Sequence, residues 1–180
     1  MVQISGGDKL AAALNDISKK LSSAGTLRVG FLENAKYPDG TPVALVAAVQ
    51  EFGAPSKGIP PRPFFRNMIA KHSKEWPKAI GDDLVNTDYD VDATLNRVGE
   101  LISSELVQSI FDLMSPPLSP VTVMLRGMSS QSQYRDMDFW SRFKIAKERV
   151  VAGKTNYGAS TKPLVDTGHL SNSVTYDVKT

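Results

Sequence analysis

The chain has 180 residues, of which 41% are apolar and 22% charged, with a formal net charge of +2 and no cysteine. This length suffices for one domain with a hydrophobic core. The near-neutral charge argues against a protein that binds nucleic acid through a strong positive field. The lack of cysteine excludes disulfides, thiolate metal sites and a cysteine nucleophile.

The first fifty residues are expected to form a helix, a strand and a second helix. Asp8 is a candidate helix N-cap, and the apolar residues after it recur at helical spacing at Leu10, Leu14, Ile17 and Leu21. Apolar and polar residues alternate over 26–32, which predicts a half-buried strand. After a loop at 33–42, a helix from Thr41 to Gly53 would bury one apolar face: Leu45, Val46, Val49 and Phe52.

The middle of the chain begins with a proline-rich segment. Residues 54–63 contain four prolines, which favour an extended and rigid backbone. A helix should start near Pro63 and be interrupted at Pro77. The strongest helical pattern covers 91–114, where apolar residues keep the helical spacing over about six turns.

The last third is less periodic. Ser119 and Pro120 resemble an N-cap followed by a first-turn proline, which predicts a short helix toward Gly127. A polar helix is expected over 136–151, and a strand over 173–178. We therefore expect a single domain over 1–180, with a core at 1–118 and 164–180 and an excursion of loop and helix at about 119–163, a length of chain that in an assembly can reach a neighbour.

Motifs for catalysis or for binding cofactors and metals are nearly absent. No phosphate-binding glycine loop or zinc-protease motif occurs. His72 and Glu75 share a helical face, but two ligands do not make a metal site, and we expect a solvated helix surface. Asp166-Thr167-Gly168 matches the aspartic-protease tripeptide. That chemistry needs two carboxylates that share a proton, so we expect a helix N-cap instead, and no catalytic, cofactor or metal residues.

Three stretches in order resemble a known protein family. They are VAAVQEFG at 46–53 with IPPRPFFR at 59–66, then SPPLSPVT at 115–122, then KPLVDTGHLSNSV at 162–174. Together they resemble the minor tail component proteins of tailed bacteriophages, also called head–tail joining or tail-completion proteins. One departure is that residues 128–160 are longer than the family usually has between its last two motifs.

The resemblance implies an α+β fold, with a curved antiparallel sheet packed by helices, and a virion protein that is not an enzyme. Such subunits form a ring, commonly a hexamer, that completes the tail or joins it to the head connector. The implied partners are connector or adaptor proteins, tail tube proteins and DNA passing through the lumen, with no membrane. The protein would be made in the host cytoplasm, since the N-terminus has no signal-peptide pattern, and would end in the tail or neck of the virion.

Assembly then predicts contacts between subunits through an extended arm, which is the segment 54–63, the excursion 119–163, or both. We expect these contacts from five residues: Arg62, Phe64, Tyr134, Trp140 and Phe143. Arg62 and Arg66 are expected to pair with carboxylates of the same or the next subunit. Three alternatives remain open: a tail terminator or connector adaptor at a neighbouring station, a phage hydrolase that uses Asp166, and a DNA-contacting protein that uses the basic residues of 142–154.

Overall fold

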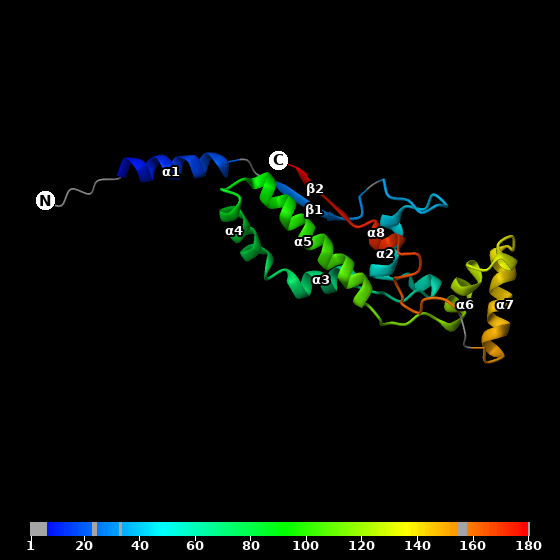
Figure 1. Ribbon diagram of the computed structural model, residues 1–180. Coiled ribbons are helices and arrows are strands. Elements are labelled where there is room, and N and C mark those ends of the chain that lie inside the picture. Colours follow the sequence, from blue (N-terminus) through cyan, green and yellow to red (C-terminus); the bar gives the residue numbers. More distant parts are fainter. Residues whose placement is uncertain (1–6, 23–24, 33, 155–157, 180) are drawn as a thin grey trace.

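The computed structural model describes residues 7–22, 25–32, 34–154 and 158–179, which form helices and one small sheet (Figure 1). The elements are α1 (Gly7–Lys20), β1 (Thr26–Gly30), α2 (Val43–Phe52), the 3-10 helix η1 (Pro55–Lys57), α3 (Phe64–His72), α4 (Trp76–Asn86), α5 (Val91–Asp112), α6 (Pro120–Ser129), the 3-10 helix η2 (Ser132–Tyr134), α7 (Phe139–Val151), α8 (His169–Asn172) and β2 (Thr175–Lys179). The expected α+β class is confirmed.

The two strands come from opposite ends of the chain. β1 and β2 pair antiparallel, with Thr26 opposite Lys179 and Gly30 opposite Thr175. Both strands pack on α5. Gly99 of α5 allows this close approach, because a Cβ there would lie 2.5 Å from the ring of Tyr176 on β2. The C-terminal strand thus completes the layer that the N-terminal strand begins.

Helix α5 is the centre of the main hydrophobic core. Its buried positions follow the predicted spacing, and they include Val98, Ile102, Leu106 and Ile110. Phe64 and Met68 of α3, Val43 and Ala47 of α2, and Leu164 and Leu170 near the C-terminus pack in the same cluster. The long helix, predicted from periodicity alone, therefore organises contacts from both ends of the chain.

A second, smaller cluster lies at the α6–α7 end. It consists of Met124, Met128, Tyr134 and Ala146. The Arg149 guanidinium lies over the Tyr134 ring, 5.3 Å from its centroid, and donates to the Tyr134 hydroxyl. Figure 1 shows α6 and α7 at one end of the molecule and α1 at the other. Both helices of the expected excursion are present; its residues 155–157 lie outside the described residues.

The buried face of α2 differs from the prediction. Val43, Ala47 and Glu51 are buried, whereas Leu45 and Phe52 are 56% and 67% exposed. The reason is the carboxylate of Glu51, which binds the start of α3 and so turns this side of the helix inward. The spacing of apolar residues therefore predicted the helix correctly, but it predicted the wrong buried face, because a polar contact sets how the helix is rotated about its axis.

Helix α1 has the predicted amphipathic pattern but contributes no buried residue. Leu10 and Leu14 are 63% and 57% exposed, and α1 extends away from the other elements in Figure 1. Nothing in the described part of the chain covers this face. No helix among the described residues is both long enough and apolar enough to span a membrane.

Candidate functional site

Glu51, at the end of α2, binds the first turn of α3. Its Oε2 accepts a hydrogen bond from the N–H of Phe65 at 2.9 Å, and its Oε1 accepts one from the N–H of Arg66 at 3.2 Å. Oε1 also pairs with Nε of Arg66 at 2.7 Å. Because Pro63 offers no capping side chain, Glu51 provides the anionic acceptor that the free N–H groups of this helix start require.

Arg62 lies beside this contact and is only 5% exposed. Its guanidinium donates to the carbonyl oxygens of Pro116 and Pro117, at 3.1 and 3.3 Å, and to Oε1 of Gln50 at 3.0 Å. Burial lowers the pKa of Arg62, and the nearby charge of Arg126 lowers it further. The expected carboxylate partner exists for Arg66 but not for Arg62, which binds neutral oxygens among the described residues.

The proline-rich segment is a closed loop and not the expected extended arm. Ala54 and Ile59 exchange backbone hydrogen bonds of 2.9 and 3.1 Å, with η1 between them. Gly53, with φ of 76°, begins the loop, and a Cβ at this position would lie 2.8 Å from the backbone nitrogen of Pro61. The turn therefore requires glycine both for its backbone angle and for its space.

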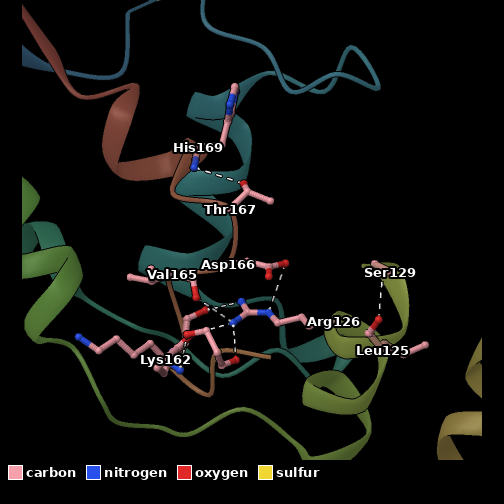
Figure 2. Close-up of polar contacts among 10 residues, drawn as sticks. Leu125, Arg126, Ser129, Lys162, Val165, Asp166, Thr167 and His169 are labelled. Carbon is pink, nitrogen blue, oxygen red and sulfur yellow. Dashed lines mark hydrogen bonds and ion pairs between the residues drawn. The ribbon is translucent and has the colours of Figure 1, made fainter. Parts of the chain in front are cut away.

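Arg126 of α6 makes the equivalent contact with the C-terminal motif (Figure 2). Its Nη1 donates to the carbonyls of Lys162 at 2.7 Å and Val165 at 3.2 Å, and its Nη2 donates to that of Pro163 at 3.0 Å. Nε lies 3.5 Å from Oδ2 of Asp166. Burial lowers the pKa of Arg126, while Asp166 acts in the opposite direction. This one side chain joins the excursion to the segment that returns to the core.

We call the set of Gln50, Glu51, Arg62, Arg66 and Arg126, with the carbonyls they bind, the arginine junction. Arg62 joins the first two stretches that carry the family resemblance, and Arg126, four residues beyond the second stretch, binds the third. Beside it is an open pocket of about 570 Å³, lined in part by Tyr37, Gln50, Arg126, Asp166 and His169. Guanidinium groups that are already bound to main-chain oxygens position backbone segments and leave few donors for a substrate.

The pocket does not contain the features that aspartic-protease chemistry would require. Asp166 is half exposed and faces Arg126, whereas that chemistry needs a second carboxylate close enough to share a proton. Burial raises the pKa of the neighbouring Tyr37 hydroxyl, and Asp166 and Asp39 raise it further. The N-cap of α8 is Gly168, in the left-handed region with φ of 77°, and not Asp166 or Thr167 as expected. Thr167 Oγ1 lies one residue earlier and accepts a hydrogen bond from the N–H of His169 at 3.3 Å.

The five residues expected at subunit contacts divide into two groups. Arg62, Phe64 and Tyr134 are buried by contacts inside the chain, which leave almost no surface for a neighbour. Trp140 is 73% exposed, and Phe143 is partly exposed beside it. Trp140 and Phe143 thus leave surface that a neighbour could contact, whereas the other three side chains serve internal packing.

Sequence reasoning missed the two residues that do most to hold the motifs together. The sequence placed Glu51 only within the helix that ends at Gly53, and Arg126 only within the short helix that ends near Gly127. The available signal for this contact was that Glu51 is a charged residue within a motif and lies 15 residues before Arg66. Nothing in the sequence near Arg126 indicated its partners from Lys162 to Asp166, which lie 36 to 40 residues away.

Comparison of the chain with protein-family models, with curated proteins and with solved structures found no match.

Proposed function

We propose that this chain is a structural subunit of a tailed-phage virion, one that forms a ring at the head–tail junction and completes the tail or joins it to the head connector. The observation that carries the proposal is the arginine junction. Residues of the first two tail-completion motifs bind each other across the chain, as Arg62 does with Pro116 and Pro117, and the third motif is bound by Arg126 of the helix that begins in the second. These contacts support an architecture shared with the tail-completion proteins, because they give the motifs a structural reason to occur together in one chain.

A surface suited to assembly lies on α7. The rings of Phe139, Trp140 and Phe143 pack against one another, with centroids 5.4 to 6.1 Å apart, instead of turning into the core. Clustered aromatic residues that stay exposed on one chain are typical of sites that another protein covers. We name these three residues the α7 aromatic patch.

A second copy of the chain is the partner we propose for this patch. Between 142 and 154 the chain has five basic residues and one acidic residue, whereas 82–92, near α1, holds five aspartates and no basic residue. The basic segment lies on and after α7, at one end of the molecule, whereas the acidic segment and the uncovered face of α1 lie toward the other end (Figure 1). A head-to-tail contact would cover both apolar faces and bring opposite charges together, and such contacts close into rings when the rotation allows.

The first experiment measures self-association of the purified full chain by light scattering coupled to size exclusion, and by negative-stain microscopy. We expect closed rings. Trp140→Ser should weaken the association about 30-fold, because truncating an interface hot spot costs about 2 kcal/mol or more. The matched control is Val151→Ser, an exposed apolar residue on the same helix outside the aromatic patch. A monomer at all concentrations, or equal effects of both variants, would contradict this contact.

The second experiment tests the station in the virion. Lysates from a phage with a nonsense codon early in this gene should contain DNA-filled heads beside unattached tails or beside tails of uncontrolled length. Copy number per particle would distinguish the junction ring from a terminator or adaptor. Intact infectious particles would overturn the structural proposal and return attention to Asp166.

A further inference from the structure

Three side chains with metal-binding atoms meet between α3, α4 and α5, on a part of the molecule separate from the arginine junction. His72 ends α3, Glu75 precedes α4, and Glu105 lies on α5. The distance from Nδ1 of His72 is 3.3 Å to Oε1 of Glu105 and 3.8 Å to Oε2 of Glu75. His72 and Glu75, the pair expected from the sequence, are too few for a metal site by themselves. Glu105, 30 residues farther along the chain, adds a third potential ligand.

The spacing of these atoms suits one small cation. Zinc lies about 2.0–2.2 Å from nitrogen and oxygen ligands in tetrahedral sites, so two ligands of one ion stand roughly 3.4 Å apart. One potential ligand atom from each of His72, Glu75 and Glu105 can be chosen so that all three lie within 4.8 Å of one another. Small side-chain rotations, above all of the exposed Glu75, would bring them to the bonding separation.

Two further contacts indicate that the site is oriented. Nδ1 of His72 is buried and forms no hydrogen bond with any described residue, although it faces two carboxylates. Glu105 is mostly buried, and its other oxygen, Oε2, accepts a hydrogen bond from Nε1 of Trp76 at 2.9 Å. Trp76 thus fixes one oxygen of Glu105 and directs the other toward His72. Outer-shell residues orient metal ligands in the same way.

We propose that His72 Nδ1, Glu75 and Glu105 bind a divalent cation of the zinc class, with water completing the coordination. The imidazole favours zinc over magnesium or calcium, which prefer oxygen ligands. His72 and Glu105 also line a small pocket of about 190 Å³, which gives an ion access from solvent. The bound ion would link the turn between α3 and α4 to the central helix α5.

The alternative for the same atoms is a protonated His72 that forms ion pairs with the two carboxylates. Both arrangements stabilise the contact between α3 and α5, but only one takes up metal. Binding of the metal itself, and not stability alone, therefore decides between them.

The test uses the full chain without an affinity tag, treated with chelator, and titrated with Zn²⁺ by calorimetry and with Co²⁺ by visible absorbance. We expect one ion per chain. His72→Ala and Glu105→Gln should lower the affinity by at least about 10–100-fold, and Trp76→Phe by about 10-fold, since outer-shell changes have effects of that size. His169→Gln, which alters the other histidine of the chain, should bind as the unaltered protein does.

Glu75→Gln protects the test against unfolding. Glu75 is highly exposed, so its substitution leaves the core intact, and it should still weaken Zn²⁺ binding. No binding by the unaltered chain would overturn the proposal in favour of the ion pairs. Binding that His72→Ala and Glu75→Gln leave unchanged, or that His169→Gln abolishes, would overturn it equally.

Discussion

The arginine junction with the neighbouring Phe64 of α3, and the α6–α7 end of the molecule, both combine arginine with aromatic residues, yet they use them differently. At the junction, Arg62 and Phe64 are almost completely buried, and Arg62 binds main-chain oxygens of another motif. On α7, Trp140 and Phe139 remain exposed and contact mainly each other. The comparison teaches that residue type identifies a contact surface poorly, because the same side chains hold one region together and are left uncovered in the other.

Arg126 connects the two regions. It belongs to α6 but binds carbonyls of the segment that leads back to α8. The α6–α7 end therefore has its own small cluster of apolar residues and a polar link to the rest of the chain. This arrangement leaves α7 exposed beside a core to which it adds no buried residue.

The sharpest test of the comparison is a pair of phenylalanines. Phe64→Ala should lower the free energy of unfolding by about 3–5 kcal/mol, because it leaves a cavity in the core. Phe139→Ala should change it by less than about 0.5 kcal/mol, as is usual for exposed positions. Denaturant unfolding of both variants measures the difference, and equal losses would show that α7 packs against the rest of the chain.

A smaller effect is expected from Arg126→Lys, which keeps the charge and loses the planar set of donors. Several carbonyls then lose their partner, and we expect a loss of about 2–3 kcal/mol, in the range for hydrogen bonds from charged groups. Hydrogen exchange should become faster in α6 while α5 stays protected. Arg135→Lys, at an exposed position, is the control, and exchange that rises equally in α5 would argue against a separate α6–α7 unit.

The smallest effect concerns Asp138, the N-cap of α7. Hydrogen bonds from the side chain and backbone of Ser141, and from the N–H of Trp140, lower the pKa of its carboxyl below the ordinary value of 3.8. Because the folded-state pKa is lowered, the cap stabilises α7 above that value and is lost as the pH falls through the lowered pKa.

The amide resonances of Trp140 and Ser141 should report this transition in an NMR titration. Asp138→Asn keeps an N-cap without a titrating group, so the acid-induced change should disappear in that variant. The same change in Asp138→Asn would assign it to another group.

The sequence predicted much of the secondary structure because local rules govern it. The spacing of apolar residues indicated α5, and Ser119 is the N-cap of α6 as expected. The helix that starts at Phe64 is interrupted before Pro77, which lies in the first turn of α4. Asp8, expected as an N-cap, instead lies in the first turn of α1. The orientation of α2 could not be predicted in this way, since the side that faces inward depends on Glu51 reaching the start of α3. The closed loop at 54–61 was missed because backbone bonds between Ala54 and Ile59 outweigh the general preference of proline for extended chain.

By itself, then, the sequence determined the helices, the two strands, the absence of cysteine chemistry and the three ordered motifs, all of which depend on neighbouring residues. Only the tertiary structure decided which arginines are buried, which aromatic residues remain exposed and which carboxylate joins His72. Those outcomes depend on residues that are far apart in the chain and meet only after folding, as Arg126 meets Pro163 and His72 meets Glu105. The physical reason is that burial and polar pairing are properties of the packed chain, whereas capping and periodicity are properties of short segments.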